Sequence, residues 1–293
     1  MDLNGLPQTV QNFINDTIQY RESGNCLDYD TCQKILEYAA DTGSQKLTGL
    51  GLYYLAECYW QKGEYENTMQ CLTESVGCLE NARMYELLAK AHNMMGAVSD
   101  RKNNRMLALS SYYNSLKYAE KYHYYYIQGM AESNIAYTLV RMRLRQEAIH
   151  HYRIAIACYD KSEKTYHLNY NRINCMIECG CCHMYLGEME EALQLWNEIE
   201  QILREAPESY YSKITLEMYR ISCELLQGHE EEALKLASDI LEQLSDWDIF
   251  EEIMDELVIL AGILAILPDG KYLEELIRII DEKNVDVYYN IFL

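Results

Sequence analysis

Cysteine and histidine crowd one short stretch of the chain, Cys175 to Gly187, which reads CMIECGCCHMYLG. Within it, Cys179, Cys182 and His183 match the C-x-x-C-H spacing of covalent haem attachment. The same side chains could also supply thiolate and imidazole ligands to zinc. These three positions share one face of a helix, so the spacing permits such a site. A Cys/His metal- or haem-binding protein is therefore one hypothesis for the chain.

A repeat in the surrounding sequence explains these residues by packing instead. Four segments carry a large residue followed by a small one, at Leu55-Ala56, Met95-Gly96, Ile135-Ala136 and Cys179-Gly180. Twelve residues after the small one comes another small residue, and four further on a bulky one, in the pairs Thr68/Leu72, Ala108/Tyr112, Ala148/Tyr152 and Ala192/Trp196. Small residues let two helices approach closely, and the bulky residue fills the groove between hairpins. We therefore expect helical hairpins with no cofactor and no metal.

Helix breakers are scarce, since the 293 residues include only three prolines and fourteen glycines. Between the helices of a hairpin, Gly63 and Gly187 suit the left-handed conformation that ends a helix. Asn103 can replace glycine at this position, whereas Arg143 departs from the pattern. The anchoring small residues recur at intervals of 40, 40, 44 and 41 residues from Thr68 to Ala233. Each hairpin should therefore have extra helical turns or longer connections than a 34-residue unit.

This pattern resembles the tetratricopeptide repeat (TPR), whose signature is W-x2-L-G-x2-Y…A-x3-F…P. The match is best in LAECYWQKGEYENTMQCL and CGCCHMYLGEMEEALQLW, and every unit lacks the closing proline. The resemblance implies an all-α fold, a right-handed superhelix of antiparallel helical hairpins of the TPR-like α-solenoid type. We expect one TPR-like domain over 1–293, with clear repeats at about 49–82, 89–122, 129–162 and 173–206. Degenerate units are expected at about 13–46, 214–247 and 248–283.

The C-terminal stretch NVDVYYNIFL begins like another apolar helix and ends at Leu293. Because a solenoid needs polar capping units, we expect the chain to be an N-terminal region excised from a longer protein. The apolar C-terminal end could also support dimerisation. Long, tyrosine-rich units of this kind resemble the sensory regions of bacterial signal-transduction proteins, in which TPRs precede an output domain such as a diguanylate cyclase. The alternative is a TPR regulator of the peptide-pheromone receptor type.

In the TPR family the first helices of the hairpins line a groove that binds peptides or protein segments. The resemblance therefore implies a ligand-binding groove, and one helical stripe supplies its residues. The candidates are Tyr53, Glu57, Trp60, Asn93, Arg101, Asn134, Tyr137, Arg141, Asn174, Cys181 and Tyr185. Asparagine amides can clamp a peptide backbone, arginine suits a carboxylate or phosphate, and tyrosine and tryptophan supply rigid apolar area.

The net charge of −21 is unevenly distributed along the chain. Residues 101–164 hold eleven Lys or Arg against five Asp or Glu, while the remainder holds fourteen against forty-one. The basic segment favours an acidic peptide or protein partner, although it could equally be a solvated face that offsets its neighbours. An acidic chain is a poor nucleic-acid binder, so we expect no nucleic-acid partner.

Motifs for phosphate binding, zinc proteases, serine hydrolases and calcium loops are absent from the sequence, so we expect no enzymatic activity in this chain. The N-terminal residues lack a basic segment followed by an apolar one, so we expect no signal peptide. The longest apolar run, Leu257 to Leu267, is too short to span a bilayer. We therefore expect no membrane partner. Eleven cysteines without an export signal favour reduced thiols in the cytoplasm.

Overall fold

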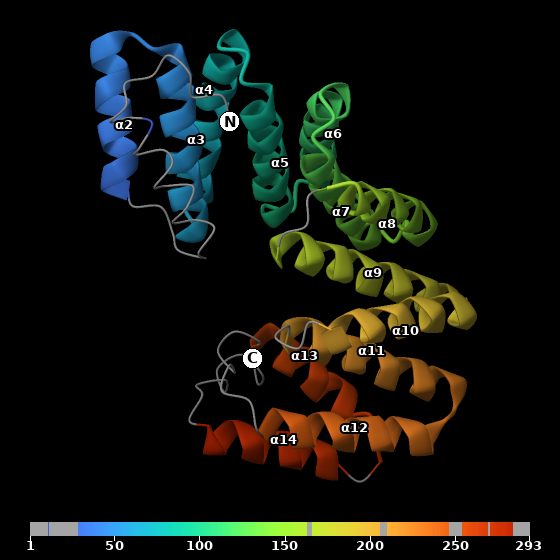
Figure 1. Ribbon diagram of the computed structural model, residues 1–293. Coiled ribbons are helices and arrows are strands. Elements are labelled where there is room, and N and C mark those ends of the chain that lie inside the picture. The colour runs from blue at the N-terminus through green and yellow to red at the C-terminus, as the bar shows by residue number, and fades with distance from the viewer. Residues whose placement is uncertain are drawn as a thin grey trace. The chain divides into compact units, whose positions relative to one another are not determined.

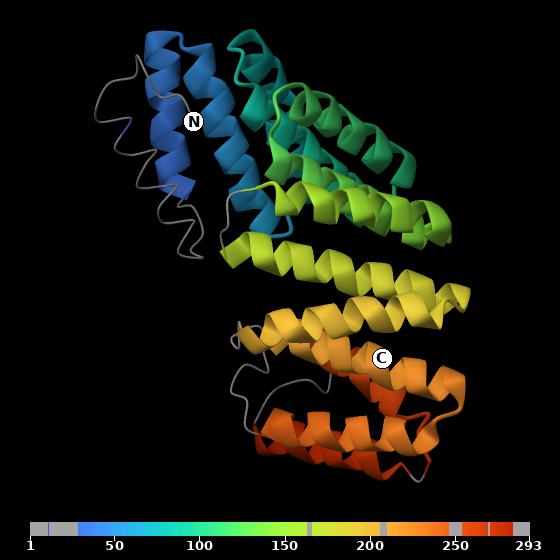
Figure 2. The ribbon, with the colours of Figure 1, turned by 45° about the vertical axis from the view of Figure 1, so that its right-hand side comes forward.

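The protein folds as a succession of α-helices that pair with their sequence neighbours (Figures 1 and 2). The computed structural model describes Gln11 and residues 29–162, 166–205, 210–245, 254–268 and 270–283. These residues form thirteen α-helices and no strand. The predicted all-α fold of helical hairpins is thereby confirmed. The chain divides into unit 1, residues 1–163, and unit 2, residues 164–293. The expected single domain over 1–293 stays a prediction.

Unit 1 contains three helical hairpins and one helix before them. That helix, α2, packs against α3, and the hairpins pair α3 with α4, α5 with α6 and α7 with α8. The bounds are α2 Tyr29–Thr42, α3 Gln45–Gln61, α4 Tyr65–Asn81, α5 Tyr85–Arg101, α6 Arg105–Lys121, α7 Tyr125–Arg141 and α8 Arg145–Asp160. Helix α2 lies within the degenerate unit expected at about 13–46, and it buries Cys32 and Ala39.

Unit 2 continues the hairpin pattern. It comprises α9 Tyr166–Leu186, α10 Met189–Glu205, α11 Tyr210–Gln227, α12 Glu230–Ser245, α13 Met254–Leu264 and α14 Lys271–Glu282. In α11, Ile221 is buried and Arg220 forms ion pairs with Glu217 and Glu200. Gly270 has φ 65° immediately before α14, so a left-handed residue precedes this helix, whereas Asp269 lies outside the described residues.

The predicted C-terminal helix, residues 284–293, lies outside the described residues, as does most of the segment before Tyr29. Across the part of the chain that the structure describes, no helix is both long enough and apolar enough to cross a membrane. The apolar run from Leu257 forms most of α13, where Leu257, Leu260 and Leu264 are fully buried.

A left-handed residue follows each helix of unit 1 from α2 to α7, at intervals of twenty residues. The six positions have φ between 57° and 72°: Gly43, Gly63, Arg83, Asn103, His123 and Arg143. The next N–H bonds back to a helix carbonyl, as when Leu144 N donates to Leu139 O at 2.9 Å. This is the Schellman motif, and it satisfies carbonyls that the helix end leaves open.

The predicted left-handed turns at Gly63, Asn103 and Gly187 are confirmed. Arg143 departs from the pattern in sequence only, because its φ of 65° gives the same backbone turn. Helices α3 to α7 each contain 17 residues. Two such helices with two three-residue turns make the forty-residue repeat, so the extra length beyond a standard unit lies in the helices.

The bulky residues expected in the groove between hairpins instead pack on the small residue of the first helix in their own hairpin. A Cβ atom added to Gly96 would overlap the Tyr112 ring, and one added to Gly180 would overlap the Trp196 indole. Glycine is therefore needed there for close approach rather than for backbone freedom. Trp196 is completely buried and Tyr112 is 3% exposed.

A serine of the second helix also bonds to the first helix of the hairpin, further from the turn that joins them. Ser75 Oγ donates to the carbonyl oxygen of Gly49 at 2.6 Å, and forty residues later Ser115 Oγ donates to that of Ala89 at 2.7 Å. Both serines are completely buried. Because a buried hydroxyl without a partner is costly, these bonds also fix the register of the two helices.

Substitutions at Gly96 and Tyr112 test the contact between the glycine and the aromatic ring. Gly96→Ala should lower the free energy of unfolding by roughly 1–3 kcal/mol, because the added methyl group overlaps Tyr112. Adding Tyr112→Leu should recover most of that loss, because Ala and Leu occupy the same repeat positions at Ala56 and Leu72. Urea unfolding of the two single variants and the double variant measures this coupling.

The matched control is Gly77→Ala, which also lies within a helix but has no neighbouring atom within 4 Å of the added Cβ. It should stabilise the protein by about 0.5–1 kcal/mol. Additive effects of Gly96→Ala and Tyr112→Leu would contradict the proposed contact.

Candidate functional site

The first helices of successive hairpins in unit 1, α3, α5 and α7, contact one another. The predicted groove residues of this unit lie on these helices. The forty-residue period brings equivalent positions of neighbouring hairpins side by side, so side chains 40 or 41 residues apart can interact directly. Two such interactions join α5 to α7.

The first is a bond between two asparagine amides. Asn134 Nδ2 on α7 donates to Asn93 Oδ1 on α5 at 3.1 Å. Asn93 is 6% exposed, whereas Asn134 is half-buried. The structure therefore brings these two predicted residues together, and their amides form a continuous polar strip across two repeats.

The second is an ion pair between Arg141 and Asp100. Arg141 Nη1 lies 2.8 Å from Asp100 Oδ2 and also donates to the Asp100 carbonyl oxygen at 3.3 Å. The guanidinium carbon lies 5.8 Å from the centre of the Tyr137 ring, a cation–π arrangement. Tyr137 is 50% exposed, and Arg101 beside Asp100 is also exposed.

Asp100 was not among the predicted site residues, although its carboxylate joins α5 to α7 through the ion pair with Arg141. The residue is 5% exposed, and its Oδ1 atom is buried without a hydrogen-bond partner among the described residues. Burial and the nearby Asp100 carboxylate raise the pKa of Tyr112. The available sequence signal was the 41-residue interval from Asp100 to Arg141, the same interval that separates Asn93 from Asn134.

The predicted residues on α3 form a packed surface. Tyr53 is 2% exposed, with its ring centre 5.4 Å from that of Tyr54 in an edge-to-face arrangement. Glu57 is 5% exposed. Trp60 is half-buried, with its ring centre 5.5 Å from that of Tyr65. The exposed part of the predicted stripe in unit 1 therefore lies on α5 and α7.

On α9, the predicted residues differ from one another in exposure. Tyr185 is 62% exposed, whereas Cys181 is 4% exposed. Burial raises the pKa of the Cys181 thiol, which shares a hydrogen bond with Tyr219. Asn174 Oδ1 is buried, and no described residue donates a hydrogen bond to it. One turn further along α9, burial raises the pKa of Glu178 to about 7, and this residue was also missed in the sequence.

The haem-like motif is packed inside the hairpin of α9 and α10. Cys179, Cys182 and His183 are no more than 3% exposed. His183 Nδ1 lies 2.6 Å from Glu188 Oε2 across the turn, which makes this histidine part of a helix-ending contact. Over the described ranges, no group of three or more His, Cys, Asp or Glu residues is arranged to hold a metal ion.

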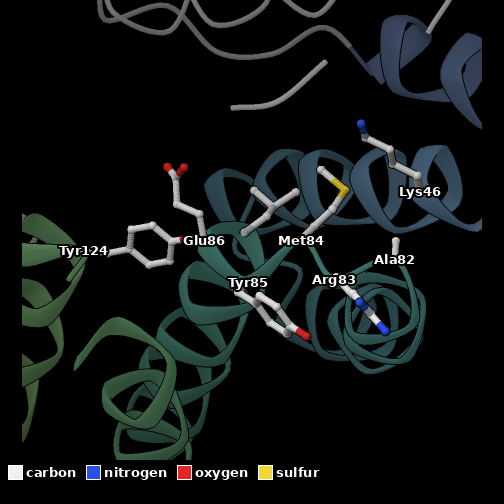
Figure 3. A pocket seen from close by; sticks show the side chains of 8 residues that line it. Lys46, Ala82, Arg83, Met84, Tyr85, Glu86 and Tyr124 are labelled. Atoms are coloured by element: carbon white, nitrogen blue, oxygen red, sulfur yellow. The ribbon is translucent and has the colours of Figure 1, made fainter. Parts of the chain in front are cut away.

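A separate hollow of about 190 Å³ lies at the starts of the first helices in unit 1 (Figure 3). Its lining comes from the turn before α5 and from residues near the starts of α3, α5 and α7: Lys46, Ala82, Arg83, Met84, Tyr85, Glu86, Leu87 and Tyr124. Glu86 forms an ion pair with Lys90 at 2.8 Å, and Tyr85 stacks on Tyr122 with 4.5 Å between ring centres. None of the predicted stripe residues lines this hollow.

No protein-family model matches the chain, and no curated protein matches it. Similar solved structures include the apo form of RapI, at a TM-score of 0.66 and 10% identity, covering 94% of this chain and 97% of that one. A Rap protein complexed with Competence and Sporulation Factor gives 0.60 and 14%, covering 96% and 72%. A Podosopora anserina putative kinesin light chain with TPR-like repeats gives 0.53 and 16%, covering 73% and 93%. The fold is therefore a TPR-like helical repeat.

The raised pKa of Glu178 predicts that the stability of the folded protein depends on pH. Its folded-state pKa of about 7 exceeds the usual 4.5, so the folded chain holds this proton more tightly than the unfolded chain. Stability should therefore fall as pH rises between these two values. Glu178→Gln cannot ionise, and it should stabilise the protein by roughly 3 kcal/mol at pH 8 but by less than about 1 kcal/mol at pH 5.

Urea unfolding at both pH values measures this difference. Glu242→Gln is the matched control, because Glu242 is exposed on α12, and it should change stability little at either pH. An equal effect of Glu178→Gln at pH 5 and pH 8 would contradict the raised pKa.

Proposed function

We propose that the face formed by α5 and α7 binds an extended segment of a peptide or partner protein. The observation that carries the proposal is the buried Asp100 Oδ1 atom, which accepts no hydrogen bond from the described residues. A buried acceptor without a donor costs free energy, so a ligand that donates a hydrogen bond there gains affinity once a small shift of the Asp100 side chain exposes the atom. A backbone N–H of an extended peptide is such a donor.

The asparagine pair supplies groups for the same backbone. Each asparagine amide offers two donor hydrogens and a carbonyl acceptor. The Asn134–Asn93 bond uses one donor of Asn134 and one lone pair of Asn93. Their other groups can pair with peptide N–H and C=O groups, and their mutual bond holds both side chains in fixed positions. Because these contacts involve the backbone, they do not depend on the ligand's sequence.

Arg101 and Tyr137 supply the contacts that select side chains. Arg101 is exposed next to Asp100, and Arg141 already neutralises that carboxylate. The Arg101 guanidinium therefore leaves this face with a net positive charge, which supports an acidic ligand group. The half-exposed Tyr137 ring is held beside Arg141, so it offers apolar area at a low cost in side-chain entropy.

The proposed role is binding without catalysis, in the cytoplasm and as part of signal transduction. A peptide-receptor type of regulator is the second candidate, and the fold similarity to a Rap protein complexed with Competence and Sporulation Factor favours it. Dimerisation through the C-terminal end belongs to the same proposal. The connection with a diguanylate cyclase output domain rests on the sequence resemblance alone.

Arg141 is unsuitable for a test substitution. Arg141→Glu would place a second carboxylate against the buried Asp100, so loss of binding could follow from loss of folding. Arg101→Glu and Tyr137→Ala alter exposed side chains of the same face. Peptides selected from a random displayed library on the full chain provide the ligand.

The double variant Arg101→Glu/Tyr137→Ala should weaken binding of a selected peptide at least about tenfold in fluorescence anisotropy. The matched control, Lys117→Glu/Tyr113→Ala, changes the same kinds of side chain at exposed positions of α6. It should leave the dissociation constant within about twofold. Failure to select any peptide, or equal affinity of both double variants, would overturn the proposal.

A further inference from the structure

Two acceptor groups on α9 have no hydrogen-bond donor among the described residues. Asn174 Oδ1 is buried and accepts no hydrogen bond from the described residues. Glu178 is mostly buried, and within the described ranges its carboxyl group forms neither a hydrogen bond nor an ion pair. Glu178 keeps some exposed surface, so a ligand can reach it. Neither group is required by the hairpin packing described above.

The two residues are four positions apart on one helix. At that spacing the side chains lie on the same face, with Cβ atoms about 6 Å apart. The Glu178 carboxylate and the Asn174 amide oxygen can therefore bind a single group when the buried Asn174 amide turns toward it. The neighbouring titratable groups are the Cys181 thiol on α9 and the Tyr219 hydroxyl on α11, which share a hydrogen bond with each other.

The nearby arginines of unit 2 are engaged with other carboxylates. Arg172 on α9 lies 3.3 Å from Glu198, and Arg220 on α11 lies 3.2 Å from Glu217. The charge of Glu178 is thus left without a compensating cation from the described residues. A buried carboxylate without a cation or donor is strongly unfavourable, so a ligand that supplies both would bind favourably.

The chemistry of that ligand follows from the two acceptors. An anion would be repelled by the Glu178 carboxylate, and a neutral hydroxyl would bring no compensating charge. An ammonium or guanidinium group brings positive charge and several N–H donors, enough to bond both oxygens at once.

We propose that Asn174 and Glu178 form a binding site for an ammonium or guanidinium group of the peptide that this protein recognises. The inference rests on the proposed peptide-binding function and adds a positively charged ligand residue to it. This site lies on α9 of unit 2 alone, and its preference is independent of the acidic preference proposed for the α5–α7 face of unit 1.

A comparison of peptide selections tests the site. A random peptide library is panned at pH 8, where Glu178 is ionised, against the wild-type chain, Glu178→Gln and Glu242→Gln. Peptides from the wild-type and Glu242→Gln selections should be enriched in lysine and arginine relative to the starting library. Glu178→Gln should lose this enrichment while still selecting peptides. A selected peptide should bind Glu178→Gln at least about tenfold more weakly than wild type.

A second arm distinguishes a peptide from a small free amine. Putrescine and argininamide, added during binding of the selected peptide, should compete only at concentrations far above that of the peptide. Competition at equal concentration would identify a small amine as the ligand and overturn the proposal in its peptide form.

The outcomes separate this inference from the proposed function. If the wild-type chain selects no peptides, both fail. If it selects peptides without basic enrichment, or if Glu178→Gln shows the same enrichment, only the cation site fails. Circular dichroism of Glu178→Gln establishes that the variant is folded, and its amide keeps the shape of the original side chain.

Discussion

The close approach of two helices at a small residue is the constraint on which the rest of this structure depends. Gly96 and Gly180 leave the space that the rings of Tyr112 and Trp196 fill. Since the aromatic side chain is buried only if the hairpin closes, hydrophobic burial and helix pairing stabilise each other. Three-residue turns with one left-handed residue keep helices α3 to α8 in the same register.

The same register creates the polar face of unit 1, where Asn93 and Asp100 on α5 meet Asn134 and Arg141 on α7. With helices of 17 residues and turns of three, residues forty apart occupy equivalent places on neighbouring first helices. A residue one position beyond the equivalent place, 41 residues on, is close enough for contact, and so Asn134 reaches Asn93 and Arg141 reaches Asp100. Packing inside the hairpins thus positions the hydrogen-bonding groups outside them, and a change of helix length by one residue would rotate these groups out of alignment.

Periodicity predicted the fold well, because small–large spacing and turn glycines are local properties of the sequence. Exposure of individual side chains was harder to predict, since Tyr53 and Arg101 belong to one stripe yet differ in burial. Asp100 and Glu178 were missed for a related reason. Their importance comes from unsatisfied atoms in a low-dielectric environment, which depend on helices distant in sequence. Arg143 is the opposite case, because the repeated turn places it in the left-handed conformation that arginine seldom adopts.

A crystal structure of the full chain with a selected peptide tests the central claim most directly. We expect an extended peptide across α5 and α7, with one backbone N–H donating to Asp100 Oδ1. The side-chain amides of Asn93 and Asn134 should contact the peptide backbone. A peptide bound on α4 and α6, or in the hollow beside Tyr124, with Asp100 Oδ1 left without a donor, would contradict it.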